Sequence, residues 1–201
     1  NIRCHSPAAP GVPTAPCAAR TPLFIRLLRP AMPTDTTHLA FVALGANLAA
    51  PVQQVRTAGE ALAELPDSRL LQLSSLYRTA PVGIRGQPDF VNAVAALATG
   101  LDPQQLLDAL FAVERQFGRR REFHHAPRTL DLDLLLYDDL VLASTRLTLP
   151  HPRMHLRAFV LAPLVEIAPL CRIPGRGSAA AWLPAVHRQR IEKLADCHQP
   201  Q

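Results

Sequence analysis

The order of the regular segments constrains this chain more than any other feature of its sequence. Short apolar runs that are typical of strands alternate with segments of helical periodicity, and the fourth run is followed by further helical periodicity. We predict strands over 38–44, 69–77, 90–97 and 129–137, a short strand over 146–149, and helices over 51–65, 103–117, 156–165 and 180–194. The core order β-α-β-β-α-β predicts an α+β protein with a ferredoxin-like antiparallel sheet. The extra C-terminal helices would complete a three-layer αβα arrangement.

Residues 1–37 differ from the rest of the chain. The segment is rich in Pro, Ala and Thr, and residues 1–33 hold four arginines and no acid. We expect 1–37 to be a disordered or non-native N-terminal extension and 38–198 to be one folded domain. Most of the net charge of +5 belongs to the extension, so a basic face for nucleic acid has little support.

The composition favours a soluble protein. No apolar stretch reaches the roughly 18 residues of a membrane span. The four cysteines form no C-x-x-C pair, which favours free thiols in a reducing compartment. We expect a cytoplasmic monomer that binds neither membrane nor nucleic acid.

Two acids, Asp131 and Asp133, lie within the apolar run 129–137. Side chains two positions apart on a strand share a face, so both carboxylates would point one way and the leucines the other. Such a pair suits Mg²⁺, which takes the rest of its ligands from water and phosphates. A strand with one solvated acidic face remains the alternative.

A loop with four arginines and two histidines, 119–128, directly precedes the acid pair. Arginines beside a metal-binding acid pair are what phosphoryl transfer needs. A second segment, 149–159, again sets histidine and arginine beside an aromatic residue. A solvated charged loop, an RNA-binding loop or a structural histidine would give the same patterns.

Phe90 and Asn92 would share one strand face. An aromatic ring and an amide together match a flat heterocycle, because one stacks on it and the other reads its edge. An ordinary buried Phe beside a satisfied Asn is the alternative. The chain has no P-loop, Rossmann, nucleophile-elbow or H-E-x-x-H motif.

Taken together, these segments resemble the 6-hydroxymethyl-7,8-dihydropterin pyrophosphokinase family (HPPK) from about residue 39 to 169. The matching strings, in order, are A-L-G-A-N-L at 43–48, S-S-L-Y-R-T-A-P at 74–81, Q-P-D-F-V-N at 87–92, A-P-R-T-L-D-L-D-L-L-L-Y at 126–137, L-P-H-P-R-M at 149–154 and R-A-F-V-L-A-P-L at 157–164.

The resemblance implies a Mg-dependent diphosphotransferase that moves pyrophosphate from ATP to the pterin hydroxymethyl oxygen and releases AMP, in folate biosynthesis. It implies two Mg²⁺ ions held by Asp131 and Asp133, and catalytic arginines at Arg119 and Arg128. The implied ATP contacts are Glu114, Arg119, Arg121, Arg128, His151 and Arg157. The implied pterin contacts are Thr79, Val82, Phe90, Asn92 and Phe159.

Two other classes share parts of the pattern. RNA-recognition sheets use the same element order, but they need exposed aromatics and a basic face. Aromatic residues make up only 5% of this chain. Other nucleotide-dependent transferases carry D-x-D pairs, but they usually need a larger nucleotide-binding domain than this length allows.

Overall fold

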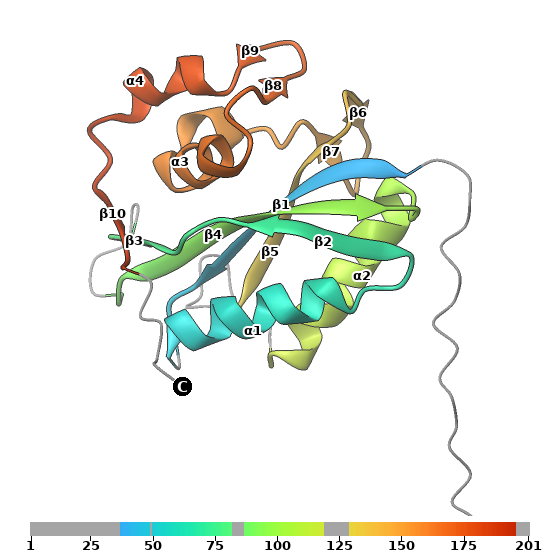
Figure 1. Cartoon of the computed structure of the whole chain (residues 1–201), viewed down its shortest axis with the longest axis horizontal. Helices are drawn as coiled ribbons and strands as arrows, with labels where there is room; N and C mark the ends of the chain where they lie inside the picture. The colour runs from blue at the N-terminus through green and yellow to red at the C-terminus, as the bar shows by residue number, and fades with distance from the viewer. Residues whose placement is uncertain (1–36, 49, 82–86, 119–128, 196–201) are drawn as a thin grey trace, which may run out of the picture. The chain divides into compact units, whose positions relative to one another are not determined.

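The computed structural model describes residues 37–48, 50–81, 87–118 and 129–195. The chain divides into the units 1–31 and 32–201, and all described residues belong to the second. The elements in chain order are β1 (His38–Ala46), α1 (Pro51–Ala63), β2 (Ser68–Leu73), β3 (Tyr77–Thr79), β4 (Phe90–Thr99), α2 (Pro103–Gln116), β5 (Asp131–Tyr137), β6 (Leu142–Ala143), β7 (Thr148–Leu149), η1 (Met154–Leu156), α3 (Ala158–Ile167), β8 (Arg172–Ile173), β9 (Gly177–Ser178), η2 (Ala180–Trp182), α4 (Leu183–Val186) and β10 (Ile191–Lys193) (Figure 1).

An antiparallel sheet forms the centre of this unit. Its strand order is β10-β3-β4-β1-β5, and β2 also pairs with β4. All pairings are antiparallel, including those of β1 with β4 and with β5. The expected antiparallel sheet is therefore confirmed. Strands β1 and β4 lie in its middle and pair with neighbouring strands on both sides.

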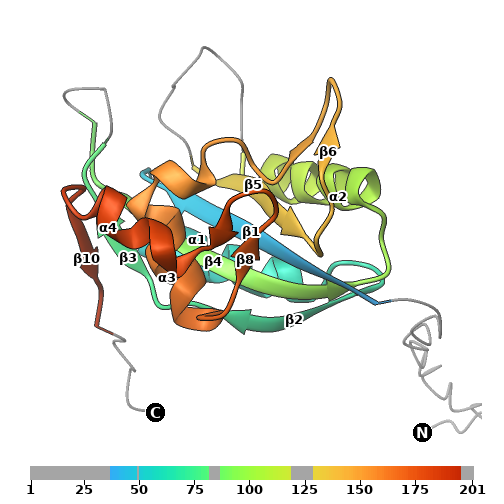
Figure 2. The same cartoon turned by 90° about the horizontal axis from the view of Figure 1, so that it is seen from above.

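Helices cover both faces of the sheet: α3 and α4 lie above it and α1 and α2 below it in Figure 1, and Figure 2 looks onto the face that carries α3 and α4. On one face, α1 and α2 pack on alternate residues of β1 such as Val42 and Leu44. On the other face, α3 and α4 pack on the intervening residues, such as Phe41 of β1 and Val94 of β4. Because side chains of a strand alternate between faces, Asn92 lies on the same face as Val94, the face that α3 covers.

The second helix begins and ends where the sequence predicts. Asp102 accepts hydrogen bonds from the backbone of Gln104 and Gln105, and the Gln105 side chain accepts one from the Asp102 backbone in return. This capping box satisfies amide groups that the first turn leaves without partners. Past the helix end, Gly118 has φ of 75°, a conformation that glycine adopts without steric cost.

Two sequence predictions of single elements are wrong. The strand expected over 69–77 is divided into β2 and β3, because Ser74 turns its backbone and its hydroxyl to the backbone of Val94. The helix expected over 180–194 is only η2 and α4, followed by β10. There the Gln189 side chain bonds the backbone of Ala158 and Leu156, and β10 pairs with β3, so tertiary contacts override helical periodicity.

None of the helices in the described ranges is long and apolar enough to cross a membrane.

A buried histidine in η1 is expected to make the stability of the fold sensitive to acid. His155 is 6% exposed, its Nδ1 has no hydrogen-bond partner among the described residues, and its ring meets Trp182 edge-on at 4.8 Å. Burial, with a smaller contribution from Arg176, lowers the pKa of His155. As pH falls, the His155 imidazole therefore takes up a proton in the unfolded chain before it does so in the folded protein. The free energy of unfolding should then fall as pH drops below about 6.5.

His155→Phe should weaken that dependence. We expect urea unfolding at pH 7 and pH 5 to show a smaller loss of stability for this variant than for the wild type. His187→Gln, at an exposed position, is the matched control and should behave as the wild type. An unchanged pH dependence in His155→Phe would show that other groups cause the acid sensitivity.

Candidate active site

Three neighbouring strands bring the predicted site residues into one row. Gly45 on β1 pairs with Asn92 on β4 at one side and with Asp131 on β5 at the other. All three positions lie on the α3 face, near the ends of the strands. The amide and the first acid, 39 residues apart in sequence, are therefore separated by a single glycine in the sheet.

The acid pair has the alternation that the sequence predicts. Leu130, Leu132 and Leu134 are buried, whereas Asp131 and Asp133 are partly exposed. The Asp133 side chain is 41% exposed. Two hard oxygen ligands on one face with access to solvent fit Mg²⁺, which keeps several waters and phosphate oxygens in its shell.

An arginine and a histidine from the segment before α3 approach the second acid. Arg157 Nη1 and His151 Nε2 each lie 3.9 Å from Asp133 Oδ2. Burial and the nearby Arg157 and Arg153 lower the pKa of His151 to about 4. At neutral pH the imidazole is therefore uncharged, and Arg157 is the cation of this group.

The first turn of α3 adds an aromatic ring to the same group. Arg157 is the N-cap residue of α3, and Phe159 follows in the first turn. The Arg157 guanidinium carbon lies 5.5 Å from the centre of the Phe159 ring, which is a cation–π contact. The helix start thus presents a ring and a cation together on the side of β5 that carries the acids.

On the other side of Gly45, β3 supports the amide. The Asn92 side-chain NH₂ donates to Thr79 Oγ1 at 3.0 Å, and both residues are buried. This bond fixes the orientation of the amide, with Oδ1 on the side of Gly45. Phe90, paired with Thr79 in the register, is partly exposed on the same face.

Glu114 has a structural contact that the sequence does not reveal. It is 1% exposed, and its Oε1 accepts a hydrogen bond at 2.8 Å from the backbone NH of Leu132, which lies between the two acids. The carboxylate of α2 therefore holds β5 in place. Its expected contact with ATP stays a prediction.

Four predicted site residues, Arg119, Arg121, Arg128 and Val82, lie outside the described residues. Glu114 belongs to α2, which covers the opposite face. The structure brings the two aspartates, the cation, the histidine, the amide and the aromatic rings together on the α3 face of the sheet.

Gly45 is a residue of this site that the sequence argument missed. A Cβ built on it would lie 3.2 Å from Asn92 Oδ1. The missing side chain therefore leaves space that the Asn92 amide uses. The signal was present, because an isolated glycine inside a strand often marks a close approach.

Fold and site together define the class: an α+β protein with an antiparallel sheet that presents two carboxylates beside an arginine, a histidine and an amide. The 7,8-dihydro-6-hydroxymethylpterin-pyrophosphokinase (HPPK) family model matches residues 41–169. The chain belongs to this family.

Relatives and solved structures agree with the family. A 2-amino-4-hydroxy-6-hydroxymethyldihydropteridine pyrophosphokinase of Pseudomonas aeruginosa is 47% identical over 154 residues, which cover 77% of this chain and 95% of that protein. The protein of the same name from Haemophilus influenzae is 47% identical over 129 residues, 64% of this chain and 81% of that one.

The fold also resembles that of a solved Plasmodium falciparum HPPK-DHPS, with a TM-score of 0.59 and 12% identity over 76% of this chain. This chain spans 44% of that longer protein. At such low identity the likeness concerns the fold alone.

Proposed function

We propose that this protein transfers the pyrophosphoryl group of ATP to the hydroxymethyl oxygen of 6-hydroxymethyl-7,8-dihydropterin, giving the pterin diphosphate and AMP in folate biosynthesis. One observation carries the proposal: the register that sets Asn92 and Asp131 on either side of Gly45. The group that would read the pterin edge and a group that would hold a metal then lie close together, as transfer between ATP and the pterin requires.

The acid side of the row would bind the phosphates. Asp131 and Asp133 would hold two Mg²⁺ ions, which when bound neutralise phosphate oxygens around the attacked β-phosphorus. Arg157 would hold a phosphate oxygen through its guanidinium fork, and His151, neutral at pH 7, would donate or accept one hydrogen bond. The loop arginines Arg119, Arg121 and Arg128 would add charge-assisted bonds to ATP, with Arg119 and Arg128 nearest the transferred group.

The amide side would bind the pterin. Asn92, with its NH₂ engaged by Thr79, would accept a hydrogen bond from the ring edge through Oδ1. Phe90 and Phe159 come from β4 and α3 and would stack on the two faces of the ring. Val82 would close the end of this site.

The proposal also includes the topology, the domain bounds, the oligomeric state and the location of the protein. We infer a ferredoxin-like topology, which the strand order and the antiparallel pairings support. We also infer one catalytic domain over residues 38–198, preceded by an extension, and a monomer that acts in the cytoplasm.

A product assay tests the function. Protein incubated with Mg-ATP and 6-hydroxymethyl-7,8-dihydropterin should release AMP in equal amount to the pterin diphosphate, and no AMP without the pterin. Chromatography separates AMP from ADP. Pterin-dependent ADP would refute attack at the β-phosphorus, and folded protein that forms neither nucleotide would refute the proposed function.

A further inference from the structure

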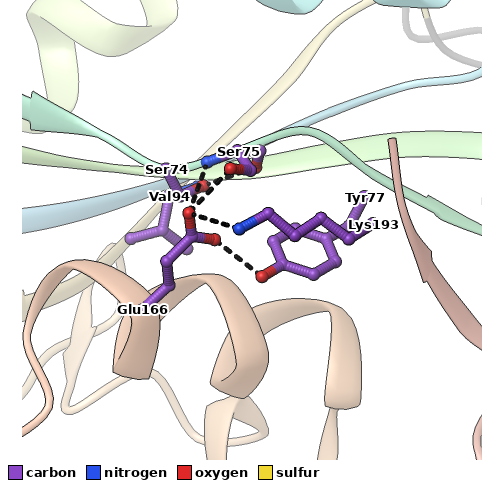
Figure 3. A network of polar contacts seen from close by, with 6 residues as sticks. All are labelled: Ser74, Ser75, Tyr77, Val94, Glu166 and Lys193. Atoms are coloured by element: carbon purple, nitrogen blue, oxygen red, sulfur yellow. Dashed lines mark hydrogen bonds and ion pairs between the residues drawn. The ribbon is translucent and has the colours of Figure 1, made fainter. Parts of the chain in front are cut away.

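One carboxylate, Glu166, joins three separate parts of the fold (Figure 3). It lies in the last turn of α3. Its Oε1 accepts hydrogen bonds from the Ser75 hydroxyl at 2.7 Å and the Ser75 backbone NH at 3.3 Å, and Lys193 Nζ lies 3.2 Å away. Its Oε2 accepts a hydrogen bond from the Tyr77 hydroxyl at 2.6 Å.

These contacts keep Glu166 ionised. Burial alone would raise its pKa, but the hydrogen bonds from Tyr77, Ser75 and Lys193 outweigh burial and lower the pKa to about 2. Burial and the bond to Glu166 raise the pKa of the Tyr77 hydroxyl, so it remains a donor. A charged acceptor with several donors holds its geometry better than a neutral pair does.

Strand β3, which Glu166 contacts through Tyr77, also supports the Asn92 amide. Tyr77 is the register partner of Asn92 across β3 and β4, and Thr79, which receives the Asn92 hydrogen bond, lies two residues further along β3. Strand β3 has only three residues. It pairs with β4 on one side and with β10 on the other through three residues each, so few main-chain hydrogen bonds fix its position.

The helix end opposite Glu166 carries the other half of the site. Arg157 and Phe159 stand at the start of α3, and Arg157 approaches Asp133 of β5 there. Helix α3 is thus tied to β5 at its start and to β3 at its end. The distance between Phe159 and the Thr79–Asn92 pair depends on both ties.

We propose that Glu166 is a positioning residue that fixes β3 against α3 and thereby sets the affinity for the pterin, while ATP binding does not depend on it. The proposal rests on the proposed function. Glu166, Tyr77 and Lys193 would therefore affect the affinity for the pterin, although none of them belongs to the row formed by Asn92, Gly45 and Asp131.

Glu166→Ala tests this by separating two Michaelis constants. The KM for the pterin at saturating Mg-ATP should rise about 10-fold, as the loss of a charge-assisted bonding group predicts. The KM for ATP at saturating pterin should stay within about 2-fold. Tyr77→Phe removes one of the hydrogen-bond donors to Glu166, and it should raise the pterin KM by less and leave the ATP KM unchanged. If Glu166→Ala does not fold, Tyr77→Phe tests the proposal in its place.

Glu192→Gln is the matched control. Glu192 lies on β10 beside Lys193 and contacts Arg78 of β3 at 3.8 Å, but both of these side chains are exposed. It should leave both constants unchanged. Folded Glu166→Ala or Tyr77→Phe protein with a wild-type pterin KM, or with equal rises in both constants, would overturn the proposal.

The wild type is measured first. Wild-type protein without pterin-dependent AMP refutes the proposed function, and the positioning role falls with it. Active wild-type protein with an unaltered pterin KM in the variants refutes the positioning role alone.

Discussion

Asp131→Ala and Asp133→Ala should each lower kcat at least about 1,000-fold. Each variant removes one of the two carboxylates that we expect to hold Mg²⁺ against the phosphates, and the metal supplies several kcal/mol of charge stabilisation in such transfers. The measurement is the steady-state rate of pterin-dependent AMP release at saturating substrates. Retention of more than about 10% of wild-type kcat in either variant would contradict the metal assignment.

We expect both variants to lose activity while their free energy of unfolding stays close to that of the wild type. Like charges on neighbouring same-face positions repel each other. The 3.9 Å contacts of Asp133 to Arg157 and His151 involve a partly exposed carboxylate and contribute about 0–1 kcal/mol. We therefore expect urea unfolding free energies within about 1 kcal/mol of the wild type. Asp139→Ala, an exposed acid in the turn that follows β5, is the matched control and should keep full activity.

The sequence predicts those parts of the molecule that local pattern determines. The alternation of leucine and aspartate over 130–134 gives the orientation of β5, because one face must be buried and the other cannot be. Asp102 and Gly118 give the ends of α2, because capping is a local property of the chain. The antiparallel sheet follows from the order of these elements.

The parts that the sequence could not give depend on contacts between distant residues. At the level of sequence, Glu114 is only an ATP contact implied by the family resemblance. Its burial and its bond to the Leu132 backbone depend on the packing of α2 against β5. Periodicity over 180–194 predicts one helix, but residues 191–193 instead form a strand that pairs with the outer edge of β3. The network of Glu166 spans residues 75 to 193, and no local pattern reports it. The Mg²⁺, ATP and pterin roles of the site residues come from the family resemblance and remain predictions.

Gly45→Ala should raise the pterin KM about 30-fold and leave the ATP KM within about 2-fold. The added methyl group would lie 3.2 Å from Asn92 Oδ1, and it must displace the amide because the backbone of β1 is paired on both sides. Overpacking of filled space costs about 1–3 kcal/mol, and 2 kcal/mol corresponds to about 30-fold in affinity. Initial-rate measurements with each substrate varied in turn give both constants.

Gly59→Ala is the matched control for this effect. Its Cβ would come 2.8 Å from Leu73 Cδ2, the flexible end of a side chain on the face covered by α1, away from the Asn92 amide. It should therefore alter stability and neither Michaelis constant. If Gly45→Ala folds and binds the pterin as the wild type does, then Asn92 does not read the ring from its present position. A built Cβ at 3.2 Å requires the amide to shift by a few tenths of an ångström, and a pterin site that tolerates this shift does not depend on the present position of Asn92 Oδ1.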